Sequence, residues 1–196
     1  MKIVADKDLR VAADADGTFL NLKGRFCEWL KEEYDIDFKY KNITYHSYGK
    51  NYPPVDDAAI RSHKKFSEGG AQAAFLEFMQ NPRVYDRVKP LEGSIEFLSK
   101  VKNLSVITAM MHNARDHYAS KMECIEKYLP KAKIWTSDSD QKHFLRCDII
   151  FEDRLDICKA FEVVGTKYFL IKQPWNEYYN DPRTFTWDEI NKITLG

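Results

Sequence analysis

The sequence predicts an α/β fold, in which a doubly wound, mostly parallel sheet carries helices on both faces. Two observations lead to this fold class. Apolar runs of strand length end in polar or turn residues, and segments with helical apolar spacing separate the later runs. Such alternation favours a parallel sheet covered on both sides. The runs are "LRVAA" (9–13), "LSVITA" (104–109), "RCDIIF" (146–151) and "KYFLIK" (167–172), and the helical segments are 93–103, 113–129 and 155–165.

A mostly helical insertion interrupts this alternation after the first run. Asn21 is placed to cap a helix whose apolar residues share one face, and two further helical segments follow at 56–66 and 71–80. An aromatic, proline-containing loop at 40–54 separates the first helix from the second. We therefore expect a catalytic core of residues 1–18 and 89–196, with a small helical cap at 19–88. A cap in this position stands over the carboxyl end of the sheet, where open α/β folds bind ligands.

Composition limits the classes of partner. Thirty basic residues balance thirty acidic ones among 196 residues, so no net field favours nucleic acid or an anionic membrane. The four cysteines form no CxxC pair, which indicates reduced thiols. The charged start does not fit a signal peptide, and no apolar run reaches the ~18 residues of a membrane span. We expect a cytoplasmic protein with no membrane contact, no stable nucleic-acid partner and only local phosphate binding.

The first apolar run ends in an acidic turn, "DADGT". Two carboxylates at i and i+2, Asp14 and Asp16, are not stable together at a buried strand end without a cation or a proton between them. Gly17 allows a sharp turn beside a ligand. Other aspartate pairs, at 6–8, 35–37 and 138–140, do not follow an apolar strand in this way and fit surface turns. The Asp14 pair is therefore the candidate reaction centre.

Three further features fall where a phosphoryl-transfer site needs them. Thr108 ends the second run, and its hydroxyl and the following amides are suited to phosphate oxygens. Lys142 precedes the third run and supplies an ammonium group. Glu152 and Asp153 end that run and complete an oxygen-rich site of the kind Mg²⁺ prefers. Each feature alone also fits an ordinary strand end or a solvated side chain, but their order at the core strand ends indicates one site.

These segments resemble the four motifs of the haloacid dehalogenase superfamily of phosphatases, which match "VAADADGT", "VIT", the Lys142 segment and "DIIFED". Within that superfamily the sequence is similar to the 5'(3')-deoxyribonucleotidases, a cytosolic type of 5'-nucleotidase. The closer likeness rests on "RVYDRVKPLEGSIEFLSKVKNLSVIT", "SDQK", "DIIFEDRLD", "QPWN" and "TWDEI". It covers residues 9–20 and about 88–190, and it is faint across the cap.

The resemblance implies a division of roles. Asp14 is the expected nucleophile and Asp16 the expected acid and base. Mg²⁺ is expected on the Asp14 carboxylate, the Asp16 backbone carbonyl and Asp153, with Glu152 nearby. The expected phosphate-binding positions are Thr108, Ala109 and Lys142.

Two departures from the nucleotidase pattern matter. Ala109 stands where those enzymes commonly carry a hydroxyl residue, which puts one phosphate or sugar contact in doubt. Glu152-Asp153 stands where paired aspartates are frequent, so Asp153 is the expected direct metal ligand. In the cap, Tyr45, Tyr48 and Tyr85 are candidates for stacking on a nucleobase, with ordinary packing as the alternative.

The expected function is a magnesium-dependent phosphatase of nucleotide metabolism that hydrolyses deoxyribonucleoside 5'-monophosphates through an aspartyl phosphate, with a homodimer possible. Two alternatives stay open. One is a phosphatase for sugar phosphates or nucleic-acid 3' ends, and the other is a noncatalytic phosphate-binding protein on the same fold. The presence of both Asp14 and Asp16 argues against the second, since binding alone does not require an acid and base beside a nucleophile.

Overall fold

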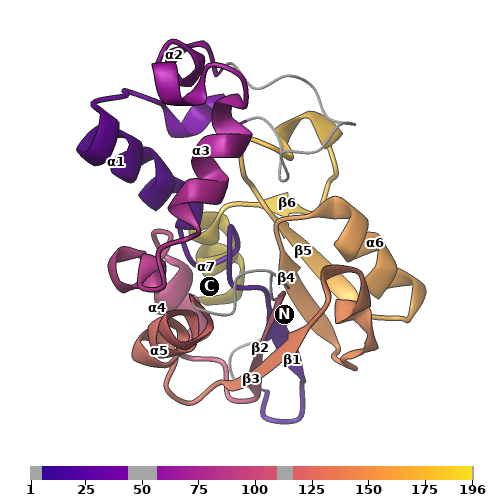
Figure 1. Cartoon of the computed structure of the whole chain (residues 1–196). Coiled ribbons are helices and arrows are strands. Elements are labelled where there is room, and N and C mark those ends of the chain that lie inside the picture. The colour runs from indigo at the N-terminus through magenta and orange to yellow at the C-terminus, as the bar shows by residue number, and fades with distance from the viewer. Residues whose placement is uncertain (1–5, 44–56, 110–116, 196) are drawn as a thin grey trace.

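A six-stranded parallel sheet forms the centre of the protein, here a computed structural model that describes residues 6–43, 57–109 and 117–195 (Figure 1). The strand order is β3-β2-β1-β4-β5-β6, and every neighbouring pair is parallel. This is the doubly wound α/β sheet that the sequence predicts. The strands are β1 (Val11–Ala13), β2 (Leu104–Ala109), β3 (Lys133–Ser137), β4 (Ile149–Glu152), β5 (Lys167–Ile171) and β6 (Thr184–Phe185).

Helices cover both faces of this sheet. Helix α6 (Leu155–Val163) packs on one face, where Ala12 and Ile150 join its apolar residues in one buried cluster. The opposite face contributes Ala13 and Phe151 to the larger cluster, whose members include residues of α4 (Ser94–Leu98), α5 (Tyr118–Tyr128) and α7 (Trp187–Leu195). Because successive side chains of a strand point to opposite faces, the short central strands are buried on both sides.

Two strands and one helix lie where the sequence predicts no element. Strand β3 lies at the edge of the sheet and is half-exposed, with Trp135 50% exposed, so it lacks the apolar run of a central strand. Strand β6 has two residues, and α7 follows it. Helix α4 is shorter than the predicted segment 93–103, since it ends at Leu98.

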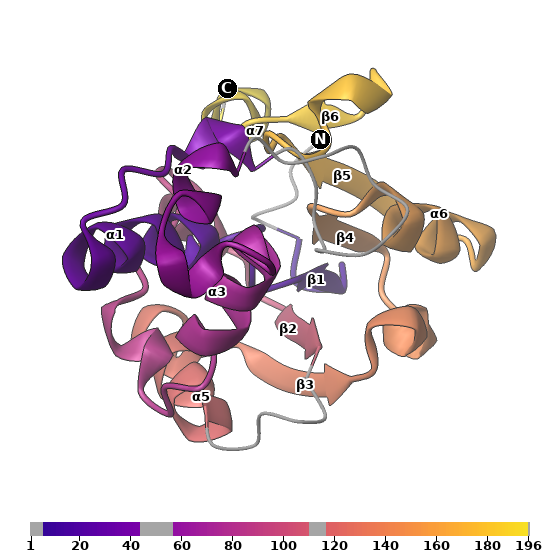
Figure 2. The ribbon, with the colours of Figure 1, turned by 45° about the horizontal axis from the view of Figure 1, so that its top comes forward.

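The segment after β1 is helical, as predicted. Its helices are α1 (Leu22–Tyr34), α2 (Ala58–Arg61) and α3 (Gly70–Phe78), with 3-10 turns η1 (Tyr40–Asn42), η2 (Lys64–Phe66) and η3 (Val84–Arg87). The Asn21 side chain accepts a hydrogen bond from the Gly24 amide and caps α1. Figures 1 and 2 show α1, α2 and α3 gathered together beside one end of the sheet. The division into a core and a cap at 19–88 stays a prediction.

The strand order makes the carboxyl end of β1 the place where a ligand is expected to bind. The chain continues from β1 to its neighbour β2 on one side, and later returns to β4 on the other, so the connections reverse direction between β1 and β4. Open parallel sheets bind ligands at the carboxyl ends of strands at this reversal. The register pairs Ala13 with Phe151, which brings Asp14 level with Glu152, the last residue of β4. Among the described residues, no helix has the length and apolar character needed to cross a membrane.

Candidate active site

The acidic turn begins directly at the end of β1. The Asp14 amide donates to the Phe151 carbonyl at 2.9 Å, which continues the sheet by one residue and fixes Asp14 beside the end of β4. Gly17 has a φ of +78° and its amide donates to the Leu20 carbonyl at 2.9 Å, closing the turn. The Asp14 side chain is 6% exposed and that of Asp16 is 27% exposed. The two carboxylates therefore belong to one turn, but only Asp16 faces solvent.

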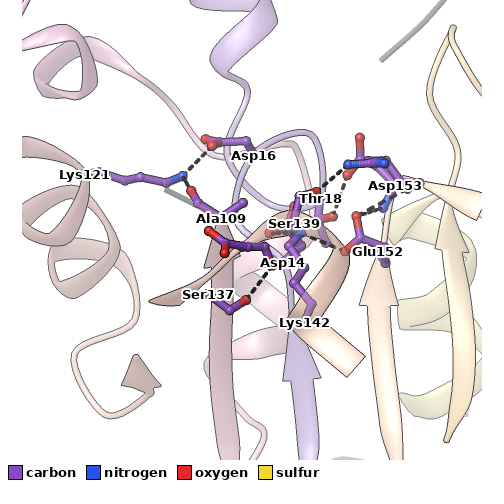
Figure 3. A network of polar contacts seen from close by, with 12 residues as sticks. Asp14, Asp16, Thr18, Ala109, Lys121, Ser137, Ser139, Lys142, Glu152 and Asp153 are labelled. Atoms are coloured by element: carbon purple, nitrogen blue, oxygen red, sulfur yellow. Dashed lines mark hydrogen bonds and ion pairs between the residues drawn. The ribbon is translucent and has the colours of Figure 1, made fainter. Parts of the chain in front are cut away.

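A buried lysine joins the ends of β1 and β4. Lys142 lies in the 3-10 helix η5 (Ser139–Phe144), and its ammonium is 2.8 Å from Asp14 Oδ1 and 3.0 Å from Glu152 Oε2 (Figure 3). Burial alone lowers the pKa of Lys142, but the charges of Asp14 and Glu152 outweigh it and raise that pKa above its ordinary value. Lys142 is therefore a fixed cation between two carboxylates.

Glu152 and Asp153 have different surroundings. Glu152 Oε2 accepts from Lys142, while Oε1 accepts from the backbone amides of Asp153 and Arg154 at 3.2 and 3.3 Å. Asp153 accepts from the Thr18 hydroxyl at 3.3 Å and from the Trp175 indole at 2.9 Å. Oxygens of Asp14, Glu152 and Asp153 lie within 4.8 Å of one another. Glu152 holds the lysine and the loop, whereas Asp153 completes an acidic cluster with Asp14.

Burial changes the acidity of this cluster. It raises the pKa of Asp14 to about 7 and that of Glu152 to about 7, although Lys142 opposes both shifts. Burial and the charge of Asp14 raise the pKa of Asp153 to about 6. The ionised form of a carboxylate is disfavoured in a buried site unless a cation compensates it. Three carboxylates beside one lysine therefore create a site that attracts a further positive charge.

Asp16 has partners from two other elements. The Lys121 ammonium, on α5, donates to Asp16 Oδ2 at 2.6 Å and to the Ala109 carbonyl at 3.1 Å. The Tyr85 hydroxyl, on η3, lies 3.1 and 3.0 Å from the two carboxylate oxygens of Asp16. Lys121 and Tyr85 are almost fully buried. The more exposed of the two aspartates is thus held by two buried side chains.

A second lysine reaches the site from α1. The Lys23 ammonium lies 3.7 Å from the centroid of the Trp175 ring, and Trp175 in turn donates to Asp153. Burial lowers the pKa of Lys23 to about 7, while the charge of Asp153 opposes this shift. Asn176 donates to the Asp153 carbonyl at 2.9 Å. The loop after β5 therefore supports Asp153 through both an indole and an amide.

The end of β2 lies beside this cluster. Thr108 is completely buried, and its hydroxyl has no hydrogen-bond partner among the described residues. A buried polar group without a partner costs about 1–3 kcal/mol, so a ligand oxygen that reached the Thr108 hydroxyl would be favoured. The next residue, Ala109, contributes its backbone carbonyl to Lys121.

The structure brings together most of the residues that the sequence predicts. Asp14, Lys142, Glu152 and Asp153 are in contact or within one cluster, and Asp16 follows in the same turn. Tyr45 and Tyr48 lie outside the described residues. Tyr85 is 1% exposed and binds Asp16 through its hydroxyl, which places it as a partner of the acidic turn. Contact of these three tyrosines with a substrate stays a prediction.

Sequence reasoning missed Lys121, Lys23 and the contact of Trp175 with Asp153. A signal for both lysines existed in the helical spacing. Lys121 shares the buried face of α5 with Cys124 and Ile125, three and four residues later. Lys23 similarly lies among the buried residues of α1. A lysine within an apolar helical face is seldom buried unless it is paired, so each position indicated an acidic partner in the core.

Replacing Gly17 by alanine is expected to destabilise the protein and disturb the cluster. An added Cβ would lie 2.6 Å from Asp153 Oδ2 and 2.9 Å from the Trp175 ring. Gly165 is a matched control, because its φ is +88° but nothing lies within 4 Å of an added Cβ. In urea unfolding, Gly165→Ala should cost about 1–2 kcal/mol for the backbone alone, and Gly17→Ala should cost more. Equal losses would show that the close approach to Asp153 is unimportant.

Solved structures of other proteins share the fold of this chain. A haloacid dehalogenase family hydrolase from Deinococcus radiodurans R1, solved with phosphate and sodium, matches with a TM-score of 0.52 at 11% identity, covering 96% of each chain. A haloacid dehalogenase-like hydrolase from Burkholderia xenovorans LB400 matches with a TM-score of 0.51 at 10% identity, covering 97% of this chain and 98% of the other. Direct sequence comparison finds no match among curated proteins. The fold is therefore that of the haloacid dehalogenase-like hydrolases.

The family model gives the narrower assignment. Residues 8–195 match the model described as 5' nucleotidase, deoxy (pyrimidine), cytosolic type C protein. The chain belongs to this family, which confirms the resemblance found in the sequence. It is accordingly a phosphomonoesterase of the nucleotidase type.

Proposed function

We propose that the protein is a magnesium-dependent phosphatase that hydrolyses deoxyribonucleoside 5'-monophosphates through an aspartyl phosphate on Asp14. The observation that carries this proposal is the joining of Asp14, Lys142 and the buried acidic cluster at one end of the sheet. A nucleophile, a fixed cation and hard oxygen ligands are the parts that phosphoryl transfer requires. Family membership supports the nucleotide as the substrate class.

The donor set fits Mg²⁺. The clustered groups are all carboxylates, and Mg²⁺ prefers oxygen ligands and is typically held by one or two carboxylates. Asp14 and Asp153 would hold the ion with the Asp16 backbone carbonyl, while Glu152 is occupied by Lys142 and the backbone amides of its own loop. Bound magnesium would supply charge stabilisation to the phosphoryl oxygens.

The chain's own residues would carry the two displacements. In the first, an Asp14 oxygen attacks phosphorus, the bond to the ester oxygen breaks, and Asp16 gives that oxygen a proton. In the second, Asp16 takes a proton from water as the water oxygen attacks phosphorus and the bond to Asp14 breaks. The 27% exposure of Asp16 suits both transfers, because this carboxylate meets the leaving group and then water.

Two groups would bind the phosphoryl oxygens. Lys142 would neutralise charge beside Asp14, where its ammonium already lies at 2.8 Å. The buried Thr108 hydroxyl would gain, in a phosphate oxygen, the partner that the other described residues do not provide. The phosphate bound to the similar hydrolase from Deinococcus radiodurans is in keeping with this class of ligand.

We also propose that residues 19–88 act as the substrate-selecting cap and that the enzyme works in the cytoplasm. The first proposal is supported by Lys23 and Tyr85, which come from this segment and contact Trp175 and Asp16 at the site. The second is supported by the cytosolic type of the family.

A phosphate-release screen tests the function. Nucleoside monophosphates, sugar phosphates and 3'-phosphorylated oligonucleotides would each be assayed with Mg²⁺ and with EDTA. We expect turnover to be fastest on deoxyribonucleoside 5'-monophosphates and to require Mg²⁺. A preference for sugar phosphates or for oligonucleotide ends would contradict the nucleotidase assignment, and full activity in EDTA would contradict the metal.

A further inference from the structure

We propose that Lys121 and Tyr85 are positioning residues that orient Asp16 for proton transfer. This inference rests on the proposed function, since it assigns a partner to the acid and base of that mechanism. It begins from two buried polar side chains that converge on the only solvent-facing carboxylate of the acidic turn. Lys121 and Tyr85 are not part of the acidic cluster at Asp14, so a role in that cluster does not explain their contacts with Asp16.

The contacts fix one carboxylate oxygen more than the other. Asp16 Oδ2 accepts from the Lys121 ammonium at 2.6 Å and shares the Tyr85 hydroxyl, at 3.0 Å, with Oδ1. Among the described residues, Oδ1 has only its share of that hydroxyl. An oxygen that already accepts two donors has less capacity for a further proton. Oδ1 is therefore the oxygen that carries the transferred proton.

The supports come from separate elements that pack against each other. Lys121 lies one turn inside α5 and Tyr85 lies on η3, and these two elements are in contact. The Lys121 ammonium also lies 5.4 Å from the centroid of the Tyr85 ring, and the quadrupole of an aromatic ring attracts a cation at this distance. Each side chain thus restrains the other as well as Asp16.

The second bond of Lys121 connects Asp16 to the phosphate-binding strand. Its ammonium donates to the carbonyl of Ala109, the residue after Thr108 at the end of β2. Lys121 thereby restrains Asp16, the proposed acid and base, relative to the end of β2, where we propose that phosphate binds. Misplacement of such a group by about 1 Å can cost ~100-fold in rate, so a paired support of this kind has a large effect.

The distinguishing experiment uses the leaving group. A nucleoside leaves as a basic alkoxide and needs the proton of Asp16, whereas p-nitrophenolate leaves without protonation. We would measure steady-state turnover of the best nucleoside monophosphate, and pre-steady-state release of p-nitrophenolate from p-nitrophenyl phosphate. The variants are Lys121→Met and Tyr85→Phe. The matched controls are Lys127→Met and Tyr128→Phe, both on α5.

We expect kcat for the nucleotide to fall about 10- to 100-fold in Lys121→Met and about 10-fold in Tyr85→Phe, with KM nearly unchanged. The burst of p-nitrophenolate should keep its rate within about 3-fold, because its first step needs no acid. Slow steady-state release should follow the burst, since Asp16 must still activate water. The two controls should behave as the wild type.

Equal losses of the burst and of nucleotide turnover, in variants that unfold at the wild-type temperature, would overturn the inference and leave a structural role. Unchanged nucleotide turnover in both variants would overturn it as well. Failure of the proposed function would appear differently, as activity that survives Asp14→Asn. If Lys121→Met does not fold, Tyr85→Phe decides the question, because it removes only one buried hydroxyl.

Discussion

Asp14→Asn is expected to lower kcat on the best monophosphate by about 10⁴-fold or more, because an amide cannot form the aspartyl phosphate. Lys142 keeps Glu152 as a partner at 3.0 Å, so the fold should survive the change. Phosphate release under saturating Mg²⁺ measures the loss. Acid quenching of the wild type during turnover should trap one phosphoryl group on the protein, and the variant should trap none.

The same substitution is expected to stabilise the metal-free protein at pH 8. Burial raises the pKa of Asp14 from 3.8 to about 7, so the folded state retains a proton that the unfolded state has already lost. The free energy of unfolding therefore falls as pH rises from about 4 to 7, and asparagine removes this contribution. Asp140→Asn, at an exposed aspartate, should change neither activity nor stability. Activity above a tenth of the wild type in Asp14→Asn would exclude Asp14 as the nucleophile.

The sequence was sufficient for the central strands but not for the edges. Strands β1, β2, β4 and β5 are buried, so they appear as apolar runs that end at turns. Strand β3 is paired on one side only, and its exposed Trp135 and Thr136 give it no such run. Strand β6 is too short to carry a pattern. Both strands form because a neighbouring strand pairs with them, and the periodicity of a sequence does not reveal such pairing.

The candidate site likewise contains residues that the sequence predicts and contacts that it does not. Asp14 and Asp153 were recognisable because each directly follows a strand, and parallel strands bring their carboxyl ends together. Lys142 was recognisable from its place in the segment before β4. The pairing of Lys121 with Asp16 spans 105 residues, and that of Trp175 with Asp153 depends on how one loop folds back. Such contacts are set by helix rotation and loop conformation, which a sequence without a known fold does not specify.

Removing divalent cations is expected to abolish turnover and to lower the unfolding temperature, with the larger thermal effect at high pH. Mg²⁺ at 100 times its dissociation constant adds ~2.7 kcal/mol, which corresponds to roughly 5 to 11 °C for a chain of this length. Burial raises the pKa of Asp14 to about 7 and that of Asp153 to about 6, so at pH 5.5 protons compete with the ion. Differential scanning fluorimetry with Mg²⁺ or EDTA, at pH 5.5 and 8, measures the unfolding temperature, and phosphate release under the same conditions measures turnover.

Asp153→Asn separates the metal from general charge effects. It retains one oxygen, which can accept from Thr18 or from Trp175, and it loses one negative charge from the cluster. The shift by Mg²⁺ at pH 8 should therefore fall below about 2 °C. Asp188→Asn, at an exposed residue of α7, should keep the full shift. A thermal shift that is as large at pH 5.5 as at pH 8 would mean that the ion binds elsewhere. Carboxylates with raised pKa values are protonated in part at pH 5.5, so a site made of them should bind Mg²⁺ more weakly there. The pH dependence of the thermal shift by Mg²⁺ therefore tests whether the ion binds at the buried carboxylates.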